Sequence, residues 1–395
     1  MFRIRTHNQI ALRGLERFPR DRFEIASDLS DPDAILLRSH PLDADALPAT
    51  VHAVARAGAG VNNIDVAHCS ERGIPVFNTP GANANAVKEL VLAGMLLSAR
   101  HLRAGLDWVH ALEAADEADL HRQVEAGKKQ FLGRELSGRT LGVVGLGAIG
   151  SRVARIALDL GMAVIGYDPA LSVDAAWRLP SQVTPMASLE ALLARADFVT
   201  LHLPLLDATR NLVGALQLAV MKPDAVLLNF ARQGIVDDGA VAEALNNGAL
   251  GGFVSDFPSL ALAGVPGVLT LPHLGASTDE SEQNCAVMAA DALVDFLENG
   301  NIRHSVNFPD LILEPGPGAR LAVTNRNVPR MLGSVLSELA DANINVLDML
   351  NKSRDQLAYN LLDLAEAPSP AVLARIGRLE GVINVRLVHG PRDPA

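Results

Sequence analysis

The stretch Leu141-Gly142-Val143-Val144-Gly145-Leu146-Gly147-Ala148-Ile149-Gly150 decides the fold of this chain. Its first four residues form an apolar run typical of a buried strand, and apolar residues at helical spacing follow from Val153 to Leu160. The glycines of this G-x-G-x-x-G pattern therefore fall where a strand turns into a helix. That context separates a dinucleotide-binding site from a chance match, although an ordinary glycine-rich turn is the alternative.

Each glycine has its own predicted role. Gly145 permits the tight turn, Gly147 leaves the backbone open to a pyrophosphate, and Gly150 lets helix and strand pack closely. The N-terminus of the helix also offers free N–H groups to the phosphates. A second apolar run ends at Asp168, whose carboxylate can accept hydrogen bonds from the ribose hydroxyls of NAD and would repel the 2′-phosphate of NADP. The pattern therefore predicts NAD as the cofactor.

Bulk properties exclude several classes of protein. The chain has 395 residues, of which 49% are hydrophobic and 20% charged, and its formal net charge is −11. These values predict two or three globular domains and no nucleic-acid or anionic-membrane partner. No apolar run reaches the roughly 18 residues that span a bilayer, and no His/Cys cluster has zinc-like spacing, so we expect no membrane span and no metal. Cys69 and Cys285 suit buried thiols in a reducing cytoplasm.

The pattern of apolar runs divides the chain into three parts. Residues 1–97 alternate short apolar runs with helix-like stretches and predict a small parallel α/β unit. Residues 98–280 repeat nearly continuous apolar strands, which indicates a doubly wound parallel sheet of the Rossmann type. A helix is expected over 281–299. After a linker at 314–318, the order strand, helix, strand, strand, helix, strand predicts a ferredoxin-like α+β domain.

Polar residues stand where the strands of the second part end. They are Asp168, His202, Asn229, Asp256 and His273. In doubly wound sheets the ligand lies beyond the carboxyl ends of the strands, so these positions are candidates for a site. His202 is expected to be structural or to line the cofactor site, and Asp256 to contact the nicotinamide or to cap its turn.

Arg232 and His273 are the candidate catalytic residues. Removal of hydride from a secondary alcohol needs a base for the hydroxyl proton, which a histidine can supply. It also needs a cation for a substrate carboxylate, which an arginine can grip with two parallel hydrogen bonds. A structural imidazole and a surface ion pair are the alternatives. Arg38 and Arg56 end strands of the first part and suggest an anionic group such as phosphate on the substrate, with simple solvation as the alternative.

These residues resemble the D-isomer-specific 2-hydroxyacid dehydrogenases over nearly the whole chain. The third part resembles an ACT regulatory domain. The stretches that carry the resemblance are 56–65 and 73–81 in the first part, and 145–150, 229–232 and 272–278 in the second. The resemblance implies a Rossmann domain (98–280) inserted in a flavodoxin-like substrate domain (1–97 and 281–310), followed by the ferredoxin-like ACT domain at 319–395.

The resemblance also implies an activity and a site. The activity is NAD-dependent oxidation of D-3-phosphoglycerate to 3-phosphohydroxypyruvate, which begins serine synthesis. The alternatives are reduction of hydroxypyruvate or glyoxylate, and a non-catalytic NAD-sensing role on the same fold. The substrate would contact Arg38, Arg56, Ala57, Gly58, Ala59 and Arg232. NAD would contact Gly145, Gly147, Ala148, Ile149, Gly150, Asp168, Phe230, Ala231, Asp256, Gly275 and Ala276. A homodimer or homotetramer in the cytoplasm is expected.

Two departures from the family pattern affect these expectations. The family has a glutamate that pairs with the catalytic histidine, and Ala261 stands about where it belongs. His273 should therefore be held less firmly, unless Asp256, Asp279 or Glu280 substitutes. The other alternative is that a histidine without such a partner suffices. In the third part, Arg330 occupies the position of a glycine that gives room at the effector. Asn325, Asn327 and Asn345 could still bind an amino acid such as serine; the alternative is a domain that only holds subunits together.

Overall fold

The computed structural model describes residues 1–43, 45 and 47–390, and the chain forms two compact units. One unit combines Met1–Asn83 with Asp279–Ala395, and the other is Ala84–Thr278. The predicted boundary between 97 and 98 is wrong, because helix α3 (Ala84–Ala99) belongs to the second unit. Its buried face shares one core with the sheet of that unit, through Val87, Val91, Met95, Val143, Phe230 and Val254.

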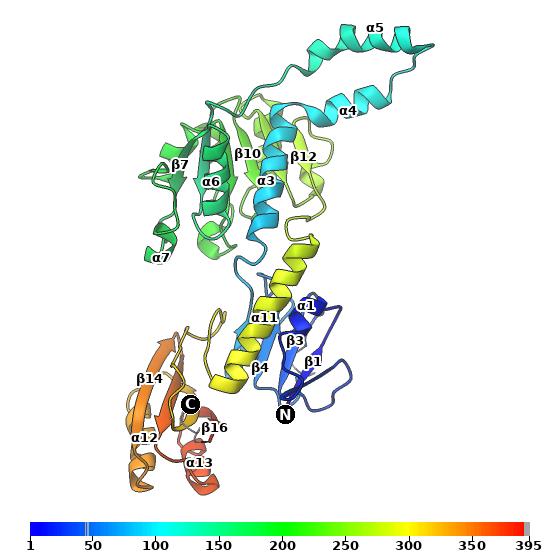
Figure 1. Ribbon diagram of the computed structural model, residues 1–395. Helices are drawn as coiled ribbons and strands as arrows, with labels where there is room; N and C mark the ends of the chain where they lie inside the picture. Colours follow the sequence, from blue (N-terminus) through cyan, green and yellow to red (C-terminus); the bar gives the residue numbers. More distant parts are fainter. Residues whose placement is uncertain (44, 46, 391–395) are drawn as a thin grey trace. The chain divides into compact units, whose positions relative to one another are not determined.

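The unit Ala84–Thr278 is built on a seven-stranded parallel sheet (Figure 1). The order β12-β11-β10-β9-β6-β7-β8 is the Rossmann order with one strand added, which confirms the predicted doubly wound sheet. The strands are β6 (Thr140–Val144), β7 (Ala163–Tyr167), β8 (Thr184–Pro185), β9 (Phe198–Leu201), β10 (Val226–Asn229), β11 (Gly252–Ser255) and β12 (Val268–Thr270).

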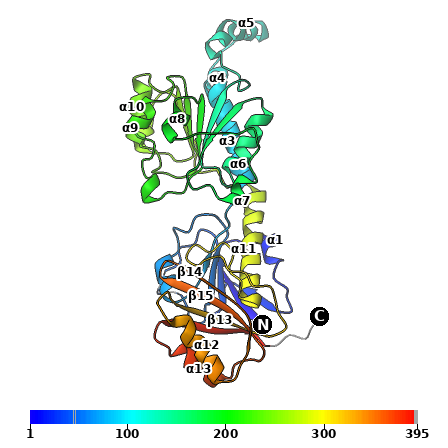
Figure 2. The same ribbon diagram turned by 90° about the vertical axis from the view of Figure 1, so that its left-hand side faces the viewer.

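Helices cover both faces of this sheet, which is why its central strands are apolar on both sides (Figure 2). Helices α3 and α6 (Gly150–Asp159) pack on one face, and α8 (Leu189–Leu193), α9 (Ala215–Ala219) and α10 (Asp238–Asn246) on the other. The short α7 (Val173–Ala176) follows β7. An arm made of α4 (Leu102–His110) and α5 (Glu117–Gly127) extends away from the sheet, as Figures 1 and 2 both show.

The other unit contains a second parallel sheet, in the order β2-β1-β3-β4-β5. This is the flavodoxin-like order, as the family resemblance implied. The strands are β1 (Phe2–Thr6), β2 (Phe23–Ala26), β3 (Ala34–Leu37), β4 (Ala53–Arg56) and β5 (Val76–Phe77). The long α11 (Asp279–Asn299) covers one face with α1 (Leu12–Leu15), and α2 (Val66–Glu71) covers the other.

The remaining elements form a four-stranded antiparallel sheet, β14-β15-β13-β16, with two helices on one face. They are β13 (Ala319–Arg326), α12 (Met331–Asp341), β14 (Val346–Arg354), β15 (Leu357–Leu364), α13 (Pro370–Gly377) and β16 (Val382–His389). The predicted ferredoxin-like pattern is therefore confirmed; residues 391–395 of the predicted domain lie outside the described residues. The other face of the sheet buries Ala322, Tyr359 and Leu361 against Phe296 and Phe308 of the same unit.

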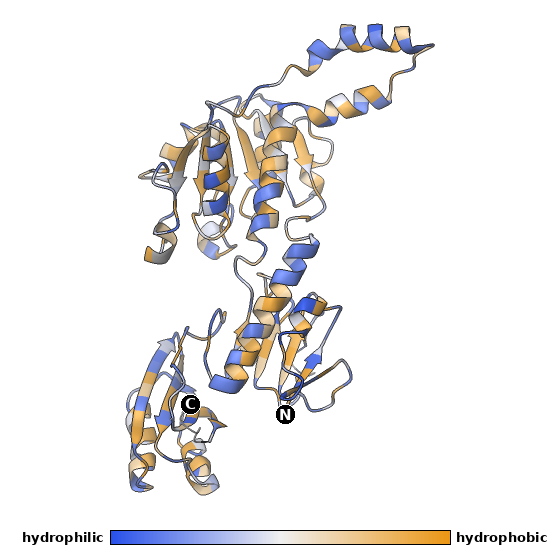
Figure 3. Cartoon of the chain, in the orientation of Figure 1, coloured by the Kyte–Doolittle hydropathy of each residue, from blue (hydrophilic) through white to orange (hydrophobic). Residues whose placement is uncertain are grey.

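Hydropathy follows this architecture (Figure 3). Strands of the parallel sheets are strongly apolar, and α4 carries an apolar stripe on the arm. No helix within the described residues is long and apolar enough to cross a membrane. Over the same residues, no group of three His, Cys, Asp or Glu side chains is placed to hold a metal. Cys69 and Cys285 are buried and unpaired.

Candidate functional site

The glycine loop after β6 is shaped by steric limits. Gly145 has a φ of +87°, in the left-handed region that favours glycine, and a Cβ there would lie 2.5 Å from the carbonyl oxygen of His202. A Cβ on Gly150 would collide with the carbonyl oxygen of Gly145. A Cβ on Gly147 would meet no atom within 4 Å. The backbone at Gly147 is therefore open to an approaching phosphate, whereas the flanking glycines are required by the turn itself.

Asp168 lies beside this loop at the end of β7. Its Oδ2 accepts a hydrogen bond from the backbone N–H of Leu146 at 2.9 Å, and its Oδ1 accepts one from Ala170 at 3.0 Å. The half-buried carboxylate thus ties the glycine loop to the next strand end. An open backbone at a helix N-terminus next to a strand-end carboxylate fits a dinucleotide, with the phosphates at the helix and a ribose at the carboxylate.

His202 at the end of β9 is a neutral, structural imidazole. Burial lowers the pKa of His202 from 6.5 to about 3. Its Nε2 lies 3.0 Å from the hydroxyl of Thr200, and its Nδ1 has no hydrogen-bond partner among the described residues. The carbonyl of His202 packs against Gly145 and leaves no room for a side chain at that position of the glycine loop. So low a pKa makes it a poor acceptor for a proton at neutral pH.

Arg232 is presented by a turn that Asn229 organises. The buried Asn229 side chain accepts a hydrogen bond from the N–H of Ala231 at 3.1 Å and donates one to the carbonyl of Arg232 at 2.9 Å. The guanidinium is exposed apart from a 2.7 Å bond to the carbonyl of Ala231. Nearby protein still removes part of its solvent and lowers the pKa of Arg232 below its ordinary value. The guanidinium remains charged, because arginine is not deprotonated in proteins.

His273 follows β12 in a strained backbone conformation that Asp256 holds. The φ of His273 is +57°, in the left-handed region. Its N–H donates to the carbonyl of Asp256 at 3.0 Å, and the Asp256 carboxylate accepts from the N–H groups of Leu274 and Gly275, both at 2.7 Å. Asp256 as a whole is 1% exposed. Because both carboxylate oxygens accept hydrogen bonds from backbone N–H groups, Asp256 does not take the place of the glutamate that pairs with the histidine in the family.

The turns that carry Arg232 and His273 meet at one edge of the sheet. Asn229 and Ser255 are register partners on adjacent parallel strands, and the N–H of Asp256 donates to the carbonyl of Asn229 at 3.1 Å. Asp256 in turn holds the His273 loop. The predicted cation, base and glycine loop therefore all lie at the carboxyl ends of strands of one parallel sheet, after β10, β12 and β6 respectively.

The other residues expected around the cofactor occupy different environments. Phe230 directs its ring into the core, where a Cβ on Gly94 would lie 3.0 Å from its Cζ, so only its backbone is available to a ligand. Ala231 and Gly275 are buried, Ile149 and Ala276 are half-buried, and Ala148 is exposed.

The expected substrate residues of the other unit cluster at the ends of β3 and β4. The guanidinium of Arg56 lies against Gly58, where it would collide with a Cβ, and its Nε donates to Asn63 Oδ1 at 3.1 Å. Arg38 forms an ion pair with Glu282 at 2.8 Å on the surface. Asn63 also donates to the carbonyl of Arg38 at 3.2 Å, so this one amide joins both predicted arginines.

A further amide supports the backbone next to Arg56. Asn78 donates through Nδ2 to the carbonyl of Ala59 at 2.7 Å, and the N–H of Thr79 donates to the carbonyl of Gly58 at 3.2 Å. The loop 57–59 is thus fixed from the end of β5. Neither Asn63 nor Asn78 was singled out from the sequence, although both lie within the stretches 56–65 and 73–81.

The three asparagines expected around an effector do not share one environment. Asn325 is buried, and its amide donates to the carbonyl of Arg326 and accepts from Asn360. Asn327 is exposed and donates to the carbonyl of Asp355 at 3.2 Å, and Asn345 is also exposed. Arg330 has a φ of +74°, in the left-handed region that a glycine would occupy without strain.

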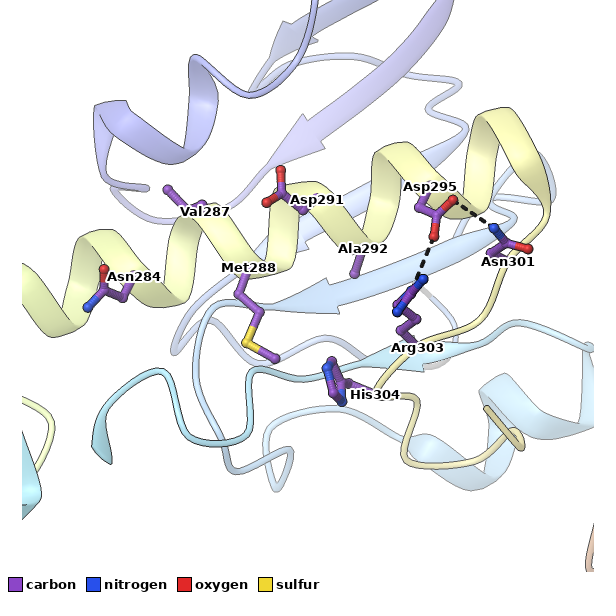
Figure 4. A pocket seen from close by; sticks show the side chains of 9 residues that line it. All are labelled: Asn284, Val287, Met288, Asp291, Ala292, Asp295, Asn301, Arg303 and His304. Carbon is purple, nitrogen blue, oxygen red and sulfur yellow. Dashed lines mark hydrogen bonds and ion pairs between the residues drawn. The ribbon is translucent and has the colours of Figure 1, made fainter. Parts of the chain in front are cut away.

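The unit that contains α11 also carries a hollow of about 380 Å³ along that helix (Figure 4). Its walls include Asp295, which forms an ion pair with Arg303 at 3.6 Å and accepts a hydrogen bond from Asn301. His304 lies at the same end. None of the residues predicted for the cofactor, the substrate or the effector lines this hollow.

The chain is similar in sequence to known dehydrogenases. Residues 92–275 match the family described as D-isomer specific 2-hydroxyacid dehydrogenase, NAD binding domain. A D-3-phosphoglycerate dehydrogenase from Synechocystis is 35% identical over 340 residues, which are 82% of this chain and 57% of the relative. The enzyme of that name from Haemophilus influenzae is 32% identical over 84% of this chain and 79% of its own length. The chain thus spans little more than half of the first relative.

Two solved structures extend the comparison. An NAD⁺-bound 3-phosphoglycerate dehydrogenase from Entamoeba histolytica superposes with a TM-score of 0.60 at 25% identity, over 78% of this chain and 99% of the other. An NADPH-dependent glyoxylate/hydroxypyruvate reductase from Sinorhizobium meliloti superposes with a TM-score of 0.64 at 25% identity, over 78% of this chain and 98% of the other.

Proposed function

The chain belongs to the D-isomer-specific 2-hydroxyacid dehydrogenase family, and from that premise we propose that it oxidises D-3-phosphoglycerate to 3-phosphohydroxypyruvate with NAD, the first step of L-serine biosynthesis. The observation that carries the proposal is the sheet edge where hydrogen bonds through Asn229 and Asp256 join the turn of Arg232 to the loop of His273. The glycine loop follows β6 at the same edge of that sheet. The relatives named D-3-phosphoglycerate dehydrogenase support the choice of substrate.

In this proposal the protein residues divide the work. His273 accepts the proton of the substrate hydroxyl, and Arg232 holds the substrate carboxylate and draws electron density toward the forming carbonyl. The backbone around Gly147 and the carboxylate of Asp168 would hold NAD, which supplies the hydride acceptor when bound. Asp168 favours NAD because a 2′-phosphate next to its carboxylate would be repelled.

We assign the substrate phosphate to Arg38 and Arg56, with Asn63 holding the two strand ends together. This assignment separates the proposal from a reductase of hydroxypyruvate or glyoxylate, whose substrates carry no phosphate. The surface pair between Arg38 and Glu282 would have to open, which costs little because exposed ion pairs contribute about 0–1 kcal/mol.

Steady-state kinetics with a panel of substrates test this assignment. We expect NAD reduction with D-3-phosphoglycerate, and a KM for it that rises at least about tenfold in Arg56→Gln, the loss of roughly 1.4 kcal/mol of binding. The same variant should leave the KM for an unphosphorylated 2-hydroxy acid unchanged. A KM for phosphoglycerate that does not change in Arg38→Gln or Arg56→Gln would reject the phosphate site. An absence of turnover with every 2-hydroxy acid, despite NAD binding, would favour the NAD-sensing alternative.

We also propose that the arm of α4 and α5 pairs with a second copy of this chain. Leu102, Leu106 and Val109 stand at i, i+4 and i+7 on α4 and are 44%, 55% and 50% exposed. The helix has no buried residue, and the ring of its Trp108 contacts Phe131, which follows α5. A symmetric partner can cover such a self-complementary stripe.

The oligomeric state tests this pairing. Sedimentation of the wild type is expected to give a dimer or tetramer, and Leu106→Asp to give a smaller species. Arg103→Ala on the polar side, where Arg103 pairs with Asp107, is the matched control and should keep the larger species. A monomeric wild type would reject the proposal.

We propose an amino acid such as L-serine as a ligand of the domain 319–395, near Asn327 and Asn345. Calorimetric titration with L-serine that shows no heat, together with dehydrogenase assays that show no inhibition by L-serine, would reject this ligand. We further propose a cytoplasmic location, which the unpaired Cys69 and Cys285 support.

A further inference from the structure

The imidazole of His273 has no acidic partner within its own unit. No described residue of Ala84–Thr278 forms an ion pair with it, and both carboxylate oxygens of Asp256 accept from backbone N–H groups. An imidazole that must accept a proton along one direction still needs its ring orientation fixed. In this chain a side chain other than a carboxylate must therefore fix the orientation of the His273 ring.

Phe257 is the side chain against the ring. Its ring centroid lies 5.0 Å from that of His273, and the planes are inclined at 65°, an edge-to-face contact. Such pairs are attractive because the positive edge of one ring meets the negative face of the other. Neighbouring residues thus hold the two parts of His273: Asp256 holds its backbone and Phe257 its imidazole.

Two features restrict the backbone of Phe257. Its N–H donates to the hydroxyl of Ser255 at 3.1 Å, and Ser255 is 2% exposed at the end of β11. Pro258 follows directly and restricts the backbone of Phe257 to extended conformations. The ring therefore projects from a fixed backbone toward the loop after β12.

We propose that Phe257 is a positioning residue for His273, and that its aromatic edge-to-face contact takes the place of the carboxylate that orients the histidine elsewhere in the family. The kinetic consequence rests on the proposed function, because it requires His273 to act as the base. The contact itself can be tested without turnover. If it orients the base, its loss lowers kcat while leaving substrate and cofactor affinity unchanged.

Three variants give the kinetic test. Phe257→Leu keeps the apolar volume without a ring, Phe257→Tyr restores the ring, and Leu260→Ala changes a neighbouring side chain that is 97% exposed. We expect Phe257→Leu to lower kcat about tenfold, the upper range for such a ring contact. Its KM and NADH dissociation constant should stay within about twofold of wild type, Phe257→Tyr should recover most of the kcat, and Leu260→Ala should match wild type.

Nuclear magnetic resonance of the imidazole protons gives the test that does not depend on activity. In wild type the carbon-bound protons of His273, assigned by their loss in His273→Gln, should be displaced by the ring current of Phe257, and Phe257→Leu should remove that displacement. A wild type without dehydrogenase activity but with the ring-current shift would overturn the proposed function and leave the contact standing. Three results would overturn the role of Phe257. They are imidazole shifts in Phe257→Leu that equal those of wild type, a kcat of that variant within twofold of wild type, and a loss of NADH affinity as large as its loss of kcat.

Discussion

Arg320 and Asp363 form a two-pronged ion pair that is shut off from solvent. Nε of Arg320 lies 2.7 Å from Oδ1 and Nη2 lies 2.8 Å from Oδ2, and the two side chains are 0% and 4% exposed. The guanidinium also donates to the carbonyls of Asn299, Leu313 and Glu314. One side chain of β13 thus joins β15, the end of α11 and the linker, which ties the C-terminal domain to the rest of its unit.

This pair should matter greatly for stability. Arg320→Met leaves the Asp363 carboxylate buried without a counter-ion, so we expect a loss of roughly 3–5 kcal/mol in the free energy of unfolding. Arg375→Met, which opens the exposed pair with Glu338, is the matched control and should cost less than about 1 kcal/mol. Urea unfolding measures both. Equal losses in the two variants would show that the buried pair has no special weight.

His202 should make stability depend on pH. Its folded pKa of about 3 lies below the unfolded value of 6.5, so the unfolded chain binds more protons as the pH falls below 6.5. The contribution of the neutral imidazole is complete above that pH and is lost on acidification by up to about 1.4 kcal/mol per pH unit. The stability difference between wild type and His202→Gln should therefore shrink between pH 7 and pH 5.

Urea unfolding at several pH values checks this dependence. His110→Gln replaces an exposed histidine on α4 and should follow the wild-type curve. If His202→Gln instead ran parallel to wild type at every pH, the imidazole would not be neutral and buried as described.

We expect the strained backbone of Arg330 to lower the stability of the protein, and a glycine there to restore it. It begins α12 with a φ of +74° and makes no side-chain capping bond. Arg330→Gly relieves a conformation that costs an L-residue about 1 kcal/mol, so its free energy of unfolding should rise by about that amount. Arg330→Ala keeps the strain and should give no gain. A decrease in Tm for the glycine variant would contradict this account.

Gly147 separates cofactor binding from folding. Because a Cβ there meets nothing within 4 Å, Gly147→Val should leave Tm unchanged while it blocks the approach of the pyrophosphate. We expect NADH to bind at least about tenfold more weakly, or 1.4 kcal/mol. Gly333→Val, at an equally open position on α12, should bind NADH as wild type does. NADH fluorescence titration decides the point, and unchanged affinity in Gly147→Val would place the phosphates elsewhere.

Much of the fold could be predicted from local pattern. Glycine spacing and apolar runs are local properties, so the Rossmann strands near Gly145–Gly150 and the strand Leu357–Leu364 were found directly. The boundary near residue 97 was missed because the apolar face of α3 says that the helix is buried, but not against which sheet.

The residue types of the site could be predicted from the sequence, but the directions in which their side chains point could not. Arg232 and His273 stand in recognisable stretches at strand ends, whereas the use of a side chain depends on where the register places it. Nothing in the sequence shows that the Asp256 carboxylate turns toward Gly275, that the ring of Phe230 enters the core, or that Phe257 meets the imidazole.

The central claim is that His273 and Arg232 support NAD-dependent oxidation of a 2-hydroxy acid, and one assay tests it most directly. It follows the absorbance of NADH formed from NAD and D-3-phosphoglycerate by wild type, His273→Gln and Arg232→Lys at equal concentrations. Wild type should form NADH steadily, and His273→Gln should lose roughly 10²–10⁴-fold in kcat. Arg232→Lys should lose activity through its single-point grip on the carboxylate. Wild-type rates in both variants would contradict the account.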